Sequence, residues 1–238
     1  MTQVNRHGPR RGTIGALRHD GDGAMAVWEG LCVLGAAAVA LAFRPWAMLA
    51  RAPLRHPWLA ALVLLPWLWR TETLLPGGLP LQLSLASLLV LMFGWPLAVW
   101  TALAAAAIAA WIGDPSLTAG AAAWAAQALH LAAWNGVLPA SVALAVGLAT
   151  RRWLPRHLMV YILARGFGAT LVAMSVTGAL WVATQPAPPG SETQLLLVGR
   201  WLIAWGDAFT TGMLSAIFVA YRPEWLATYS DRRYLPPR

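Results

Sequence analysis

The chain has 238 residues, of which 59% are hydrophobic and only 11% are charged, and its mean hydropathy is +0.59. This composition excludes an ordinary soluble domain, because too few polar residues are available to cover a surface in water. The formal net charge is +8, and all 17 basic residues are Arg. These arginines cluster in short connections between apolar runs, as membrane topology requires, and no nucleic-acid-binding motif accompanies them. We therefore expect an integral membrane protein surrounded by the lipid bilayer, with no nucleic-acid partner.

The chain begins with a polar, Gly-rich and basic segment, residues 1–24. Segments of this kind hold too little apolar surface to fold, so we expect a disordered tail. Met25, directly before "AVWEGLCVLG", is an alternative start of the protein. A transmembrane domain is then expected over residues 25–222 and a C-terminal tail over residues 223–238.

Seven apolar runs follow the N-terminal segment, at 24–43, 57–70, 79–93, 96–112, 118–150, 157–184 and 195–221. A membrane-spanning helix needs about 20 residues, with a range of about 17–25. By this measure the second and third runs are short, and the fifth is too long for one plain helix. The fold class expected is all-α, a polytopic helical bundle of about seven transmembrane helices, with six or eight as the alternatives.

The connections between the runs predict the orientation of the chain. Arginine occurs in two connections and in the C-terminal segment, at Arg44, Arg51, Arg55, Arg151, Arg152, Arg156, Arg222, Arg232, Arg233 and Arg238. The connections at 113–117 and 185–194 contain none. Because arginine is enriched on the cytoplasmic side, we expect a cytoplasmic C-terminus in a bacterial inner membrane. Seven spans then put the N-terminus outside, and only the basic segment 1–24 disagrees with that assignment.

The fifth apolar run contains "AAWNGVLPASVALAVG". Asn135-Gly136 favours a turn, and Pro139 lacks an amide and clashes with the preceding helical turn. Two interpretations remain open: a simple proline kink, or an interrupted helix that lines a substrate cavity, as in many transporters.

Asp207 is a lone carboxylate near the middle of the last run, in "WGDAFTTGM". A charge at the bilayer centre costs at least about 2.5–3.5 kcal/mol, so such a group is normally paired, cavity-facing or functional. Thr211 and Ser215 share its helical face. The preceding run carries Arg165 at a similar depth. One interpretation is a structural ion pair between Arg165 and Asp207, and the other is a carboxylate that contacts substrate.

His130 is the one His of five that falls within an apolar run away from an arginine cluster. Gln127 and Trp134 share its helical face. Imidazole is the usual nitrogen ligand of nickel or cobalt, so His130 is a candidate metal ligand or proton relay. The alternative is an ordinary hydrogen bond between two helices.

Motifs for enzymatic chemistry are missing from the sequence. There is no phosphate-cradling P-loop, no G-x-S-x-G and no H-E-x-x-H, and Cys32 is the single cysteine. We therefore expect no enzyme, no permanently bound cofactor, and ATP hydrolysis only by other chains.

Four stretches carry a resemblance to a known family: "LMFGWPLAVW" (91–100), "NGVLPASVALAV" (135–146), "WGDAFTTGM" (205–213) and "YRPEWLATYSDRRYL" (221–235). They resemble the integral membrane components of energy-coupling-factor transporters for cobalt and nickel, the CbiM type. A diverged proteobacterial branch of that family, the energy-coupling-factor transporter permeases, is more similar still. The resemblance extends over residues 60–235, and the segment after the last apolar run is its most specific part.

The resemblance implies a helical membrane protein that captures a divalent metal ion from outside. Such a protein works with a coupling transmembrane protein and cytoplasmic ATPase subunits. The chain departs from the family pattern at several positions. Typical members begin with Met-His-Ile-Pro, which neither Met1-Thr2-Gln3 nor Met25-Ala26-Val27 supplies. The branch commonly has His where this chain has Gln82 and Glu where it has Asp207, and Arg165 lies beside the place of its usual Asn.

The function expected is that of a substrate-binding or permease subunit of an energy-coupling-factor transporter, with a transition-metal ion of the cobalt or nickel class as substrate. The alternative is a non-transporting membrane scaffold or assembly factor derived from that family. The expected substrate-binding or pathway residues are Gln82, Gln127, His130, Asn135, Asp207 and Thr211, with His130 and Asp207 as metal ligands.

Overall fold

The computed structural model describes residues 11–50, 52–70, 82–155, 157–186 and 192–230, and all regular structure in these ranges is helical. The all-α fold class expected from the sequence is therefore confirmed for this part of the chain. In chain order the helices are α1 (Arg11–Ala42), α2 (Trp46–Leu49), α3 (Ala52–Arg70), α4 (Ala86–Phe93), α5 (Trp95–Gly113), α6 (Ala121–Leu131), the π-helical η2 (Ala132–Val137), α7 (Leu138–Trp153), α8 (Leu158–Val160), the π-helical η3 (Tyr161–Gly168), α9 (Ala169–Thr184), α10 (Thr193–Tyr221) and the 3₁₀-helical η4 (Pro223–Trp225).

Five helical stretches of the described chain are long and apolar enough to cross a membrane: Met25–Ala42, Trp95–Gly113, Ala121–Trp153, Leu158–Thr184 and Thr193–Tyr221. Two of the seven expected runs are not among these five stretches. The run at 57–70 lies within α3, a 19-residue helix that contains Pro57 and Pro66 and ends at Arg70. The run at 79–93 ends in α4, which has only eight residues. The count of seven spans stays a prediction.

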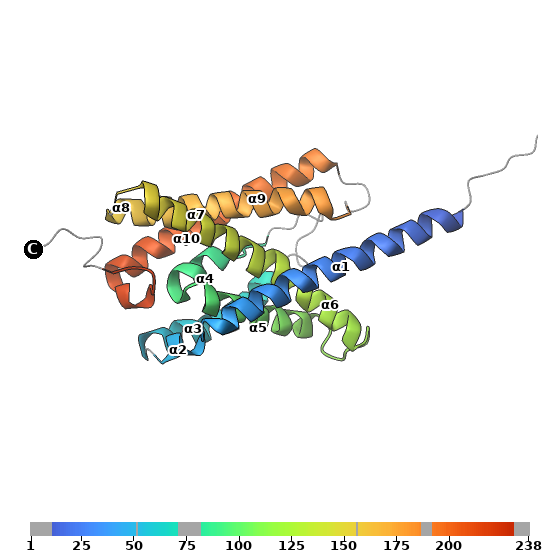
Figure 1. Ribbon diagram of the computed structural model, residues 1–238, viewed down its shortest axis with the longest axis horizontal. Helices are drawn as coiled ribbons and strands as arrows, with labels where there is room; N and C mark the ends of the chain where they lie inside the picture. Colours follow the sequence, from blue (N-terminus) through green and yellow to red (C-terminus); the bar gives the residue numbers. More distant parts are fainter. Residues whose placement is uncertain (1–10, 51, 71–81, 156, 187–191, 231–238) are drawn as a thin grey trace, which may run out of the picture.

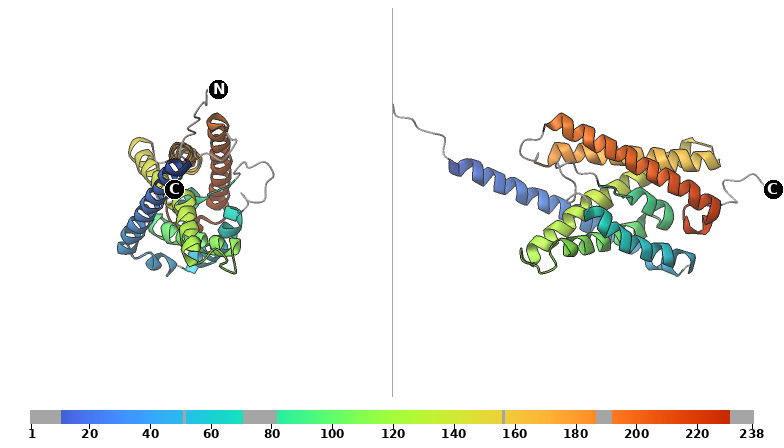
Figure 2. Two further views of the ribbon diagram at one scale, coloured as in Figure 1. Left: turned by 90° about the vertical axis from the view of Figure 1, so that its right-hand side faces the viewer. Right: turned by 180° about the vertical axis from the view of Figure 1, so that it is seen from behind.

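The helices lie roughly parallel to the long axis of the molecule (Figure 1). α9 and α10 lie side by side along one flank, and α1, α3 and α5 lie along the other, with α4 between them. α2, α8 and η4 lie at one end of the bundle, whereas the start of α6, the end of α9 and the start of α10 lie at the other. The two views of Figure 2 show the same arrangement from the end and from behind.

α4 forms the centre of the bundle, and all eight of its residues are buried. Its C-terminal end is held by the segment that follows η4, where the amides of Ala227 and Thr228 donate to the carbonyls of Met92 and Leu91. The aromatic ring of Tyr229 is buried beside them. The chain as far as residue 230 therefore belongs to the folded bundle, beyond the boundary expected at residue 222, and the expected tail at 231–238 lies outside the described residues.

The long fifth run is helical without interruption from Ala121 to its end. Between α6 and α7 the chain forms the six-residue π-helical turn η2, with right-handed helical dihedral angles on both sides. A π turn accommodates one extra residue within a helix and often occurs at functional sites. Gly136 packs directly against α5, where a Cβ atom at that position would lie 2.5 Å from the Cβ of Ala102. The Asn135-Gly136 pair thus serves close helix packing, and the helix is not unwound there.

The N-terminal helix is longer than expected. α1 begins at Arg11, so helical backbone replaces more than half of the segment expected to be disordered. Residues 1–10 lie outside the described part. In Figure 1, α1 projects beyond the other helices at its N-terminal end.

Candidate functional site

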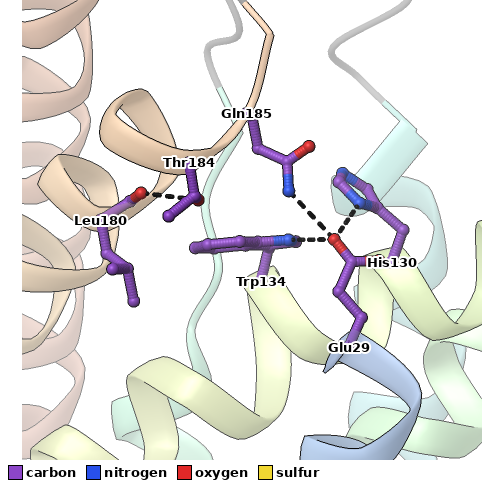
Figure 3. A network of polar contacts seen from close by, with 6 residues as sticks. All are labelled: Glu29, His130, Trp134, Leu180, Thr184 and Gln185. Carbon is purple, nitrogen blue, oxygen red and sulfur yellow. Dashed lines mark hydrogen bonds and ion pairs between the residues drawn. The ribbon is translucent and has the colours of Figure 1, made fainter. Parts of the chain in front are cut away.

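A buried carboxylate on α1, Glu29, is the centre of a polar network among four elements (Figure 3). Its Oε1 atom accepts a hydrogen bond from Trp134 Nε1 of η2 at 2.7 Å and one from Gln185 Nε2, just after α9, at 3.1 Å. His130 Nδ1, from α6, lies 3.0 Å from the same oxygen. We call Glu29, His130, Trp134 and Gln185 the outer network. Three donors on one oxygen offset the cost of burying a charge in an apolar bundle.

The outer network fixes the chemistry of the His130 ring. An ionised carboxylate only accepts hydrogen bonds, so the contact with Glu29 places a proton on Nδ1. In the neutral ring Nε2 then carries a lone pair, and no described residue forms a hydrogen bond with it. The His130 side chain is 39% exposed, whereas that of Glu29 is 7% exposed. A carboxylate behind a histidine in this way orients the ring and raises its basicity toward a metal ion.

A small pocket, which we call the inner pocket, is lined in part by Trp134 of the outer network. Its lining includes Gln82, Trp134, Asn135, Thr177, Trp181 and Arg200. Its volume is about 20 Å³, which is enough for about one water molecule. The Gln82 amide group donates to the carbonyl of Trp69. The Arg200 guanidinium lies over the ring of Trp181, 4.0 Å from its centroid, and both residues line the inner pocket.

Asp207 makes backbone contacts that neither of its two interpretations included. Its Oδ2 accepts from the Ser84 amide and its Oδ1 from the Leu85 amide, both at 3.1 Å. These two residues directly precede α4, so Asp207 caps the N-terminal end of that helix from α10. Leu85 has a positive φ of 53°, which is unfavourable for a bulky residue. The carboxylate thus holds in place a strained turn at the centre of the bundle.

The ion pair expected between Arg165 and Asp207 does not form. Within the described ranges Asp207 is in no ion pair, and the carboxylates with a basic side chain beside them are Glu29, near His130, and Glu224, near Arg222. Gly166, the neighbour of Arg165, faces Ser215 and Gly212. Those residues lie about 8–12 Å further along α10 than Asp207 by helix rise. Arg165 therefore packs nearer the other end of the bundle, where its guanidinium lies 5.4 Å from the centroid of the Tyr161 ring.

The other expected site residues fall into separate groups. Gln82 and Asn135 meet at the inner pocket, and His130 belongs to the outer network. Gln127 is exposed on α6, and Thr211 is fully buried. The hydrogen-bond partners of His130 and Asp207 are different residues, and the expectation that these two side chains ligate one metal ion stays a prediction. No group of three or more His, Cys, Asp or Glu side chains suited to a metal ion occurs among the described residues.

Glu29 is the functional candidate that the sequence interpretation missed. The signal is present, because Glu29 is the single charged residue in the apolar stretch Met25–Ala42. The cost argument applied to Asp207 applies equally to this carboxylate. His130 makes the helix-to-helix hydrogen bond that was one of its two interpretations, and Glu29 is its partner.

Comparison of the chain with protein-family models, with curated proteins and with solved structures finds no match in any of the three.

Proposed function

We propose that the chain is the membrane-embedded substrate-capture subunit of a transporter, with a divalent transition-metal ion of the cobalt or nickel class as its substrate. The observation that carries the proposal is the His130 imidazole, which Glu29 orients through Nδ1 while Nε2 is left to bind a ligand. Imidazole is a preferred ligand of these metals, and the carboxylate behind it strengthens the bond.

The position of the outer network supports capture from one side of the membrane. His130 is half-exposed, and the network lies toward the end of the bundle where α6 and α10 begin and α9 ends. The arginines in the connections, such as Arg44 and Arg151, belong to the opposite end. The preference of arginine for the cytoplasm then gives an external network, a cytoplasmic C-terminus and an inner-membrane location.

The Arg200 guanidinium opposes the passage of a cation through the bundle in the absence of partner subunits. A cation held at His130 would meet this positive charge in the inner pocket on its way through the bundle. The chain alone therefore serves capture better than conduction. Release would depend on a coupling transmembrane protein and on ATPase subunits, which we propose as its partners.

Metal binding to the purified chain in detergent tests the proposal. The parent should bind nickel or cobalt by isothermal titration calorimetry, and elemental analysis should give about one ion per chain. His130→Ala should abolish this binding. His56→Ala is the matched control, because His56 is exposed on α3 and lies outside the network, and it should bind like the parent. Equal binding by the parent and His130→Ala would remove His130 from the site.

A non-transporting membrane scaffold is the second candidate. It is favoured by the observation that the described residues contain no group of three or more metal-ligating side chains. On this alternative the outer network would only tie α1, α6 and the end of α9 together. A parent protein that binds neither nickel nor cobalt would favour the scaffold over the capture subunit.

A further inference from the structure

A second cavity lies among α4, α7 and η3, nearer the end of the bundle that carries the C-terminal residues. We call it the arginine cavity. Its volume is about 110 Å³, which is enough for several water molecules or a small polyatomic ion. Its lining includes Ser87, Gly147, Leu148, Arg151, Arg165 and Thr228. None of these residues belongs to the outer network or to the inner pocket.

Ser87 gives the first indication of a ligand. It is 3% exposed, and its hydroxyl group has no hydrogen-bond partner among the described residues. Buried polar groups in native proteins are nearly always hydrogen-bonded. A hydroxyl group that lines a cavity and has no protein partner is therefore expected to bind a molecule or an ion inside the cavity. The hydroxyl can donate to an anion or to a water molecule.

The charge of the cavity wall defines the kind of partner. Arg151 and Arg165 both line the cavity, and none of its described lining residues is acidic. Gly147 of α7 packs against the Arg165 side chain, since a Cβ atom there would lie 3.7 Å from its Nε and Nη2 atoms. Two guanidinium groups beside a hydroxyl suit the oxygens of a tetrahedral oxyanion, because guanidinium donors match phosphate geometry.

We propose that the arginine cavity binds a phosphate-type oxyanion, supplied either by the headgroup of an anionic lipid or by free phosphate. The cavity reaches the surface beside Leu148, which is 53% exposed on an apolar helix, and Arg151, which is exposed. An apolar surface beside a basic pocket is the environment in which a lipid headgroup meets protein. Free phosphate could reach the same donors from water at this end of the bundle.

Thermal unfolding of the purified chain in a neutral detergent tests the site, with the 15 Trp residues as the fluorescence probe. One arm compares sodium phosphate with sodium chloride at equal ionic strength. The other arm compares phosphatidylglycerol with phosphatidylcholine in mixed micelles. A ligand that binds the folded state raises the unfolding temperature with its concentration, so the titration gives an apparent Kd. A response to phosphate identifies the free ion as ligand, and a response to phosphatidylglycerol alone identifies the lipid.

Two substitutions connect the response to the cavity. Arg151→Gln should weaken the apparent affinity by about tenfold, because it removes a charged donor. Ser87→Ala should weaken it less. Arg152→Gln is the matched control, since Arg152 is the next residue on the same exposed helical turn and does not line the cavity. No stabilisation of the parent by either ligand would overturn the proposal, and so would equal losses in Arg151→Gln and Arg152→Gln.

Discussion

Glu29 and Asp207 are two buried carboxylates in apolar helices, and their surroundings differ in kind. Glu29 accepts hydrogen bonds from the side chains of three residues on other elements. Asp207 accepts from two backbone amides at the start of α4. Side-chain donors can rotate away or exchange for a ligand, whereas the amides of a packed turn cannot. The comparison separates a carboxylate that can take part in binding from one that holds the fold.

The exposure of the neighbouring groups supports the same distinction. Asp207 is fully buried, and so is Thr211 one turn further along α10. Glu29 is also buried, yet its partner His130 is half-exposed and has a ring nitrogen available. Burial alone therefore does not distinguish a structural carboxylate from a functional one. The two are distinguished by the type of hydrogen-bond donor that each accepts from and by the access of that donor to solvent.

The largest effect is expected from Asp207→Ala. The substitution leaves the amides of Ser84 and Leu85 unsatisfied inside the bundle, and each buried donor without a partner costs about 1–3 kcal/mol. We expect a loss of about 3 kcal/mol or more in the free energy of unfolding, measured by denaturant titration in detergent. Asp207→Asn keeps one acceptor oxygen and should lose about half as much. A loss below about 1 kcal/mol for Asp207→Ala would contradict the capping role.

Glu29→Gln should change binding more than stability. The amide oxygen can still accept from Trp134, so we expect a loss of about 1 kcal/mol in the free energy of unfolding. Loss of the carboxylate behind a ligating His typically reduces metal affinity by about 10–100-fold, and calorimetry with nickel should show this. Glu192→Gln, at an exposed carboxylate just before α10, is the control and should leave affinity unchanged. A large stability loss with unchanged affinity would make Glu29 a second structural carboxylate.

A double-mutant cycle tests whether Asp207 and Arg165 interact. Because Arg165 is not its ion-pair partner, Asp207→Asn and Arg165→Gln should destabilise independently. We expect the two losses in the free energy of unfolding to add to within about 0.5 kcal/mol. Partial recovery of stability in the double variant would show that the two charges interact after all.

The smallest effect is expected at an exposed carboxylate, Asp114, which follows α5. The amides of Ala119 and Thr118 lower the pKa of Asp114 below its ordinary value of 3.8. A carboxyl whose pKa is lowered by folding stabilises the protein above its unfolded-state pKa, and this contribution is lost as pH falls through the folded-state pKa. Asp114→Asn should thus be slightly less stable than the parent at neutral pH and down to about pH 4, and the difference should disappear only as pH falls further, through the lowered folded-state pKa. A difference in unfolding temperature that stayed constant across this pH range would contradict the assignment.

Much of the fold could be predicted from the sequence, because a helix that crosses a lipid bilayer needs a run of about 20 apolar residues. Five of the expected runs contain helical stretches long enough to cross a membrane. α4 was harder to predict, since its eight buried residues give the same apolar pattern as the end of a longer span. Only the contact between Asp207 and the residues before α4 shows where this helix starts.

The candidate site could be predicted in part. His130 was identified from its place in an apolar run, Asn135 from the turn-favouring Asn-Gly pair and Gln82 from the family resemblance. The structure places each beside Trp134 or its network. The pairing of Arg165 with Asp207 was wrong because the two residues do not lie at a similar depth: the neighbour of Arg165 packs about 8–12 Å further along α10 than Asp207. Glu29 was missed because it lies close to a segment that has the composition of a polar tail.

The contact between Asp207 and α4 also bears on how the protein is assembled. Asp207 is separated from Ser84 by 123 positions in the chain. Ser84 and Leu85 are synthesised early, yet they have no such acceptor until α10 has joined the bundle. Amides without partners are poorly tolerated in lipid, so the turn before α4 is expected to reach its strained conformation late in folding. The insertion of α10 would then be the step that commits the earlier helices to their final packing.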